Sequence, residues 1–577
     1  MRGSQVLRRL LSYSKKYKGF FVVGILSAII GVGISLYLPI LIGHGIDYIL
    51  GPDQVNFHGL SRYLLYILGA TLVSALFQWL MNYCMNQTAF RTVYELRKSA
   101  FEKLGEVPLK YIDDHPHGNL INTVINDIEQ ISEGLLQGFI QLFSGAMTII
   151  GTLLLMLFIN IWMTVIVVAL TPLSIVVAGF IAKGIAVKFR EQSEIRGELG
   201  GFLKEMLTHQ KTVRAFAYEQ RVQERFEHIN ERLKAVGKDA QFYSSLTNPC
   251  TRFVNSTIYA IVGIAGALAV MGGQFSIGML SSLLTFANQY TKPFNEISGV
   301  ITEFQSALAS ARRVFALIDA KVEPSDQKLM ANFHAKGQIQ FQHLKFSYSK
   351  DPLIEDFNLS VQAGQTVAIV GPTGSGKSTL INLLMRFYDV NAGRILLDGI
   401  RHTDMTRETL RHQFGMVLQE TWLFKGTIRD NIAYGNDNAS EADIIKASKS
   451  AYAHHFISQL PHGYDTVLSE DGGNLSQGQR QLLAIARVML VTPPMLILDE
   501  ATSNIDTLTE ARIQKAFAKM MKGKTSFIVA HRLSTIKSAD IILVLDKGGI
   551  VEQGTHEELL EQHGFYANLY ESQFQAV

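Results

Sequence analysis

Cysteine is almost absent from this chain, which has only Cys84 and Cys250 in 577 residues. Two cysteines so far apart form no metal-ligand spacing and no disulfide framework. Both lie in or beside apolar stretches, where a free cysteine packs as a small apolar side chain. The cysteine content therefore argues against a disulfide-stapled fold and against a cysteine metal site.

Charge is missing from four long windows, which contain no Asp, Glu, Lys or Arg. These windows are residues 19–46, 63–90, 134–182 and 253–291. A helix needs about 20 apolar residues to cross a bilayer, and helices buried in a soluble core rarely run so far without a charge. The first two windows hold one span each and the last two hold two each. Six spans result, near 19–41, 63–85, 139–158, 163–182, 253–271 and 277–301.

The basic residues have a sidedness that orients these spans. Arg8, Arg9, Lys15 and Lys16 precede the first span, whereas the loop between the first two spans has only Arg62. By the positive-inside rule the N-terminus is cytoplasmic, and six crossings return the C-terminus to the same side. The first apolar run exceeds that of a secretory signal and lacks a clear cleavage site, which favours a retained membrane anchor.

The connections on the cytoplasmic side, about 86–133 and 183–252, are too long and too periodic to be loops. Apolar side chains recur at helical spacing between charges in residues 91–106, which predicts amphipathic extensions of the membrane helices. Each pair of extensions must turn at a tip. We expect one tip at 111–118, where Pro116 and Gly118 interrupt a helix, and the other near 214–219.

The second half of the chain has the pattern of a soluble α/β protein. Short β-branched runs bounded by turn residues predict buried strands at 366–370, 495–498, 526–529 and 541–545. We therefore expect a transmembrane domain at 1–320, a linker at 321–336 and a second domain at 337–577. The predicted fold is a six-span α-helical membrane domain followed by an α/β P-loop domain.

The strongest local motif is a complete GxxxxGK[ST] phosphate loop at residues 371–378. An apolar run precedes it and a helical pattern follows, which is the strand–loop–helix context that the motif requires. Glycines let backbone N–H groups converge on phosphate, Lys377 reaches the β- and γ-phosphates, and the Ser378 hydroxyl binds Mg²⁺. The expected nucleotide contacts in this segment are Gly371, Thr373, Gly374, Ser375, Gly376, Lys377, Ser378 and Thr379.

A second apolar run, 495–498, ends in Asp499 and Glu500. An acidic residue at the carboxyl end of a buried strand occupies the place of the Mg²⁺ ligand in P-loop NTPases. Asp499 is therefore a candidate metal ligand, and Glu500 a candidate catalytic residue that orients or activates water.

The stretch Leu475-Ser476-Gln477-Gly478-Gln479 narrows the class, because it resembles the LSGGQ signature of the ATP-binding-cassette (ABC) family. Tyr348, Gln419, Asp506 and His531 stand where that family has further landmarks. The whole chain resembles a type IV exporter half-transporter, and its stalk tips correspond to the coupling helices of that group.

The resemblance implies a role for each matching residue. Tyr348 stacks on adenine, Gln419 senses the γ-phosphate and Mg²⁺, and His531 holds the catalytic geometry. Asp506 lies at the dimer seam. Ser476, Gly478 and Gln479 contact the ATP of a second subunit, because the family's cassettes close head-to-tail over two nucleotides. A dimer is therefore implied, with ATP and Mg²⁺ as cofactors.

Gln477 departs from the family, which prefers glycine at this position. A side chain there crowds or re-aims the backbone that approaches phosphate. A complete catalytic set beside an altered signature resembles the competent chain of heterodimeric bacterial multidrug exporters. A heterodimer is therefore favoured, and a homodimer with a tolerated variant is the alternative.

The transported substrate is only loosely constrained. The resemblance implies export of amphipathic or hydrophobic small molecules, multidrug or lipid-like, across a bacterial plasma membrane. A homodimeric lipid or peptide exporter or flippase, or a regulatory channel on the same scaffold, is the alternative. Six spans exclude a soluble DNA-repair ATPase, and no nucleic-acid partner is expected.

Overall fold

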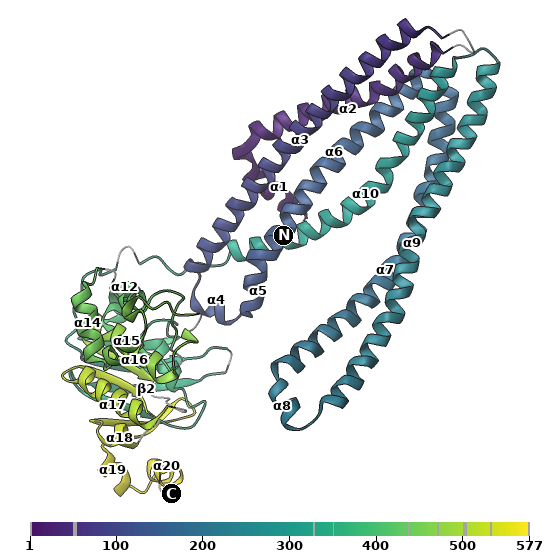
Figure 1. Cartoon of the computed structure of the whole chain (residues 1–577). Coiled ribbons are helices and arrows are strands. Elements are labelled where there is room, and N and C mark those ends of the chain that lie inside the picture. The colour runs from purple at the N-terminus through teal and green to yellow at the C-terminus, as the bar shows by residue number, and fades with distance from the viewer. Residues whose placement is uncertain are drawn as a thin grey trace. The chain divides into compact units, whose positions relative to one another are not determined.

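The chain folds into two units, one of long helices and one of mixed sheets and helices (Figure 1). The computed structural model describes residues 3–49, 55–326, 329–349, 351–419, 421–436, 438–469, 472–499, 505–530 and 533–574. Unit 1 contains Met1–Glu106 and His115–Ala320, and unit 2 contains Val107–Asp114 and Lys321–Val577. The domain boundaries expected from the sequence stay a prediction.

Helices make up unit 1. They are α1 (Gly3–Ser14), α2 (Lys18–Asp47), α3 (Phe57–Glu106), α5 (His117–Asn122), α6 (Ile128–Ile159), α7 (Ile161–Thr208), α8 (Gln210–Ala215), α9 (Glu219–Met271) and α10 (Ile277–Ile318). Their lengths confirm that membrane helices continue into the stalks, since α3 runs well past the charge-free window that ends at Phe90. The joint between α6 and α7 is tight: Asn160 caps α7 by accepting a hydrogen bond from the backbone N–H of Met163 at 3.1 Å.

Helices α7 and α9 run side by side to the short α8, which lies at the second predicted stalk tip (Figure 1). Ile195, Phe202 and Ile229 bury an apolar seam between the two stalks. Within the described residues, four helical stretches are long and apolar enough to cross a membrane, and Ile161–Leu173 is a shorter apolar helix. A membrane domain is thus present, while six spans stay a prediction.

An ion pair joins α6 to α10 in the stalk region. Asp127, at the end of a π-helical turn before α6, is buried and accepts hydrogen bonds from Ser310 (2.9 Å) and from Arg313 Nε (2.8 Å). Burial disfavours the carboxylate, but these donors outweigh it and hold the pKa of Asp127 below its usual range. The contact ties together two helices that are distant in sequence.

Unit 2 contains two sheets. In the described residues one has the order β2-β1-β4-β5 and the other β10-β9-β3-β8-β7-β6. The strands are β1 (Ile339–Phe346), β2 (Ile354–Val361), β3 (Thr366–Val370), β4 (Ala392–Leu397), β5 (Ile400–Arg401), β6 (Phe414–Val417), β7 (Met495–Asp499), β8 (Thr525–Val529), β9 (Ile541–Asp546) and β10 (Gly549–Gly554). The four strands predicted from the sequence are confirmed as β3, β7, β8 and β9.

Helices cover both faces of the larger sheet, whose strands β9, β3, β8, β7 and β6 are parallel. Side chains of β3 alternate between two cores: Val367 and Ile369 enter one, Ala368 and Val370 the other. Burial on both faces explains why this strand is a continuous apolar run. The helices of the unit are α4 (Leu109–Asp113), α11 (Lys377–Leu384), α12 (Arg407–His412), α13 (Ile428–Ala433), α14 (Glu441–Ser450), α15 (His454–Gln459), α16 (Gln477–Val491), α17 (Thr507–Met521), α18 (Leu533–Lys537), α19 (His556–Glu561) and α20 (Phe565–Phe574).

The first predicted stalk tip is confirmed in part. The helix is interrupted between Asp113 and His117, inside the predicted range 111–118, but Tyr111 is helical, within α4, and Gly118 is helical, within α5. A further interruption lies at Pro108, and Pro108 and Pro116 are each the N-cap of a short helix. Proline is favoured at a helix start, although α2, α7, α9 and α10 also contain one in their interior. At this tip the two prolines mark the helix boundaries and the glycine does not.

Candidate nucleotide-binding site

The phosphate loop connects β3 to α11, as its sequence context predicts. Gly371, Gly374 and Gly376 have φ angles of 152°, 84° and 101°, which side chains rarely adopt. A Cβ at Gly371 would lie 2.2 Å from the carbonyl oxygen of Leu545. The glycines are therefore required by backbone shape, and the loop can present N–H groups to an anion at the start of α11.

Two side chains of the loop fit a phosphate ligand. Lys377 Nζ donates to the carbonyl oxygens of Gly371 (2.7 Å) and Pro372 (2.9 Å), so the ammonium lies against the mouth of its own loop. Burial lowers the pKa of Lys377, and the charge of Asp499 opposes that shift. The buried Ser375 hydroxyl has no hydrogen-bond partner among the described residues. A phosphate would satisfy both groups.

Strand register places the acidic candidate at the same sheet edge as the loop. Ile369 of β3 pairs with Val529 of β8, and Val529 pairs with Asp499 of β7. Leu498 pairs in turn with Val417, the last residue of β6. The carboxyl ends of four parallel strands therefore lie in line, which is where ligands bind in open α/β sheets.

Three predicted metal ligands come from this edge. Asp499 ends β7 and is half-buried, Gln419 follows β6 by two residues and is exposed, and Ser378 is the second residue of α11 and is exposed. Carboxylate, amide and hydroxyl oxygens form a donor set that suits Mg²⁺. The buried Thr379 and the exposed Thr373 complete the predicted loop residues.

Tyr348 lies beside the helix that follows the loop. Its hydroxyl accepts a hydrogen bond from Asn382 Nδ2 of α11 at 3.3 Å, and its side chain is 38 % exposed. The ring meets Phe346 and Tyr388 edge-on, with centroids 4.8 and 4.9 Å away. An exposed aromatic ring supported in this way has the properties of a base-stacking platform.

The signature forms the start of α16. Ser476 is the N-cap and accepts from Gln479 N at 3.2 Å, while Gln479 Oε1 accepts from Ser476 N at 3.0 Å. A Cβ at Gly478 would lie 2.4 Å from Thr509 Cγ2, so this glycine allows α16 to pack on α17. Asp506 caps α17 by accepting from Thr509 N at 2.9 Å. Asp506 and the signature thus lie at the paired starts of two packed helices.

Two of the predicted catalytic residues lie outside the described residues. They are Glu500, which directly follows Asp499, and His531, which follows β8 by two positions. Asn382 and Tyr388, which position Tyr348, were not predicted from the sequence. Their signal is weak, because Asn382 is an ordinary polar residue within α11 and Tyr388 an ordinary aromatic residue after it. Only the fold shows that they surround one ring.

A Mg²⁺-bound nucleotide fits this arrangement, because the glycine-rich loop, the half-buried Lys377 ammonium and the oxygen donors come from one sheet edge and from the helix that begins there. Comparison with known proteins agrees. The ABC transporter transmembrane region family matches residues 21–294, and the ABC transporter family matches residues 354–503.

Three bacterial relatives resemble almost the full chain. An uncharacterised ABC transporter ATP-binding protein of Bacillus subtilis is 39% identical, over 99% of this chain and 94% of the relative. A fatty acid ABC transporter ATP-binding/permease protein of Mycobacterium bovis is 39% identical, over 89% of this chain and 82% of the relative. An ATP-dependent lipid A-core flippase of Syntrophus aciditrophicus is 35% identical, over 99% and 94%. The chain therefore belongs to the ABC transporter family, as an ATP-hydrolysing, membrane-embedded exporter of type IV.

Proposed function

We propose that this chain is one half of a dimeric pump that exports acidic amphiphiles across a bacterial plasma membrane. The main support for a pump is that the phosphate loop and Asp499 lie at the same sheet edge. The same chain also contains helices long and apolar enough to cross a membrane. Cytoplasmic termini follow from the basic residues that flank the first span.

In this proposal the residues of the sheet edge hold Mg-ATP. Lys377 and the loop N–H groups hold the phosphates, and Ser378, Gln419 and Asp499 supply oxygen ligands to Mg²⁺. Hydrolysis of the bound nucleotide supplies the free energy that resets the pump. Glu500 orients the attacking water and takes its proton, and His531 supports the geometry. Tyr348 supports the base.

The signature residues Ser476, Gly478 and Gln479 serve the nucleotide of a second subunit in this proposal. They begin α16, whose first N–H groups favour a negative charge. The other stalk tip, at α8, carries Phe216 with 77 % of its side chain exposed. A large apolar surface at a tip suits coverage by a partner subunit.

A heterodimer is favoured because of Gln477. It is the first residue of α16 and half-buried, so its side chain occupies the helix start that would face the partner's phosphates. Replacing glycine there weakens one of two composite sites, which a partner of different sequence would tolerate. A homodimer is the alternative. Affinity purification of the chain followed by mass spectrometry decides: a second ABC chain at equal stoichiometry supports the heterodimer, and this chain alone contradicts it.

A polar cavity between α9 and α10 supports the substrate class. Its volume is about 540 Å³, and Arg252 and Lys292 line it, with no carboxylate among the lining residues that the structure describes. Asn255 and Asn288 add amides, and the apolar core of α6, α7, α9 and α10 lies next to it through Ile258 and Ala287. Two cations beside an apolar core suit an acidic head group with a hydrocarbon tail. Relatives named for fatty acids and lipid A-core agree with this choice.

Transport into inverted vesicles tests the substrate class. The probes share one fluorescent alkyl tail and differ in a permanently charged head, a sulfonate or a quaternary ammonium. We expect ATP-dependent accumulation of the sulfonate, and its loss by about tenfold in Arg252→Gln/Lys292→Gln, since two charge-assisted contacts disappear. Lys238→Gln, on the exposed face of α9 and outside the cavity, is the matched control.

The relative accumulation of the anionic and cationic probes distinguishes the proposed substrate class from its alternatives. Equal accumulation of both heads, or preference for the cation, would contradict the acidic-amphiphile proposal while leaving the pump intact. ATP hydrolysis without accumulation of either probe would favour the regulatory-channel alternative.

A further inference from the structure

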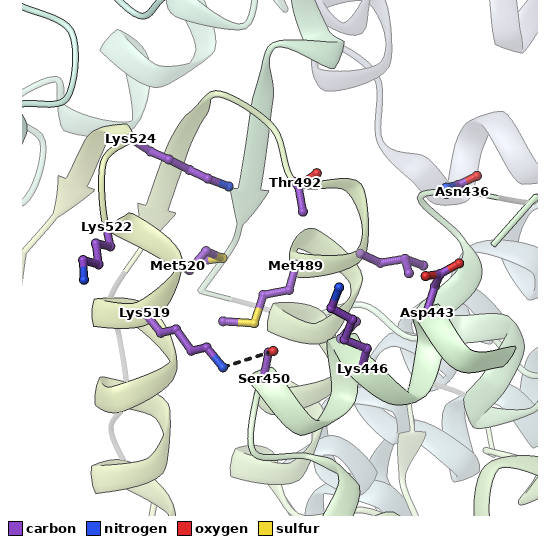
Figure 2. A pocket seen from close by; sticks show the side chains of 12 residues that line it. Asn436, Asp443, Lys446, Ser450, Met489, Thr492, Lys519, Met520, Lys522 and Lys524 are labelled. Atoms are coloured by element: carbon purple, nitrogen blue, oxygen red, sulfur yellow. Dashed lines mark hydrogen bonds between the residues drawn. The ribbon is translucent and has the colours of Figure 1, made fainter. Parts of the chain in front are cut away.

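A cavity of about 340 Å³ opens in unit 2 among α14, α16 and α17 (Figure 2). Four lysines line it: Lys446 of α14, Lys519 of α17, and Lys522 and Lys524 of the turn before β8. The ammonium groups of Lys446, Lys519 and Lys524 face the space between the helices, whereas Lys522 points away at the rim (Figure 2). The volume is in the range of small-molecule sites.

Little negative charge compensates these lysines. Among the described residues, Asp443 is the one carboxylate in the lining. It interacts electrostatically with Lys446, and it accepts a hydrogen bond from the hydroxyl of Ser440, the N-cap of α14, at 2.6 Å. Among the described residues none of the four lysines forms an ion pair within 4 Å, and Lys519 Nζ donates to the Ser450 hydroxyl at 3.1 Å. Burial lowers the pKa of Lys524, and no acidic group among the described residues opposes that shift.

The rest of the lining supplies neutral donors and an apolar floor. Ser450, Thr492 and Asn436 offer hydroxyl and amide groups, and Met489 and Met520 lie at the base (Figure 2). Thr492 has a left-handed backbone, with φ 49°, that turns the chain out of α16 at the cavity wall. Donors around an apolar base suit a ligand with a charged end and a carbon skeleton.

A simpler explanation of the lysines is that they complement the carbonyl ends of helices. The cavity lies at the last turns of α14, α16 and α17, where cations are favourable. However, backbone donors already bind carbonyl oxygens at each of these helix ends: Ala451 N donates to Ala447 O, Thr492 N to Val488 O, and Lys524 N to Met521 O. Complementing the carbonyl ends of helices also explains neither the cavity nor the way in which three ammonium groups converge on it.

We propose that this cavity binds a small phosphorylated organic anion, at a site separate from the phosphate loop. Phosphate would lie among Lys446, Lys519 and Lys524, with the carbon skeleton over Met489 and Met520. Lys377 and the other described nucleotide residues take no part, since none of them lines the cavity.

Pyridoxal 5′-phosphate tests the site in the full-length protein, because it joins a phosphate to an aldehyde that reacts with lysine. The amine attacks the aldehyde and water leaves, and borohydride reduces the imine to a stable amine that peptide mass mapping locates. We expect Lys524 to be labelled about tenfold more than Lys449, an exposed lysine of α14 outside the cavity. The reason is that several positive charges in one cleft raise the local concentration of an anion. Mapping also separates any label on Lys377.

Competitors and variants identify the ligand chemistry. Ribose 5-phosphate should suppress labelling of Lys524 while ribose does not, and Lys446→Gln/Lys519→Gln should lower it about tenfold. Lys449→Gln should leave it unchanged. Equal labelling of Lys524 and Lys449 would overturn the proposal. So would protection by inorganic phosphate equal to that by ribose 5-phosphate, or a double variant that loses thermal stability but keeps full labelling.

Discussion

The hydroxyl of Tyr388 donates a hydrogen bond to the carboxylate of Asp113, across 275 residues of sequence. Asp113 ends α4, which is covalently continuous with the stalk helices α3 and α5, and Leu109 at the other end of α4 packs on the β-sheet core. The Tyr388 ring also meets Tyr348 edge-on at 4.9 Å. One tyrosine therefore contacts both the stalk connection and the candidate base-stacking residue.

Tyr388→Phe should weaken the coupling between ATP hydrolysis and substrate transport. The ring stays to support Tyr348, so affinity for ATP should change less than about twofold, whereas loss of a hydrogen bond to a carboxylate removes about 1.5 kcal/mol. We expect stimulation of ATPase activity by substrate to fall by about tenfold. Tyr464→Phe, which removes a similar bond to His454 elsewhere in unit 2, is the control. Unchanged stimulation in Tyr388→Phe would contradict a coupling role for this contact.

Gly371→Ala should abolish nucleotide binding. Its φ of 152° and the carbonyl oxygen of Leu545, 2.2 Å from the added Cβ, leave no room for a side chain. Gly364→Ala is the matched control, because its φ is 83° and nothing lies within 4 Å. That variant should lose about 1 kcal/mol of stability and still bind ATP. Binding of a fluorescent ATP analogue is measured for both variants. Normal binding by Gly371→Ala would refute the claim that the glycine loop holds the phosphates.

Gln477→Gly should raise hydrolysis at the partner's nucleotide. The side chain at the start of α16 is removed, and the helix keeps its Ser476–Gln479 capping box. In the dimer with an intact Glu500, we expect the ATPase rate to rise about twofold as a second site becomes competent, at a cost of up to about 1 kcal/mol in helix stability. The substitution is also tested with Glu500→Gln in this chain, which silences its own site, so that the rate should rise from near background. No gain in that background would mean that Gln477 does not limit the second site.

Low pH should destabilise unit 2 through protonation of His402. The side chain is 1 % exposed, and burial, followed by the nearby charge of Arg386, lowers the pKa of His402 to about 4. Between pH 6.5 and 4 the unfolded chain binds a proton that the folded chain does not, so stability falls as the pH drops through this window. The loss approaches roughly 3 kcal/mol near pH 4. In His402→Leu the melting temperature should fall less as the pH is lowered. An unchanged fall would mean that other groups cause the loss of stability in acid.

Much of this fold follows from local pattern. Residues 366–370 form β3 with the predicted bounds, because a β-branched run before a glycine loop has few alternatives, and the joint at Asn160 follows from two apolar runs with no room for a loop. The phosphate loop is equally local. Contacts such as Tyr388 with Asp113 are not, since nothing near either residue specifies the other. The bounds of the helix at Leu109–Asp113 were not predicted for the same reason: the packing of Leu109 on the core of unit 2, to which the helix belongs, outweighs its short length.

The most direct measurement is ATP-driven uptake of the anionic probe by the purified dimer in liposomes, together with its ATPase rate. Glu500→Gln should retain ATP binding but lower both hydrolysis and uptake at least about a hundredfold, in the range expected for loss of a general base. Lys377→Ala should lose binding as well. Full hydrolysis by Glu500→Gln, or uptake that proceeds without ATP, would contradict the account.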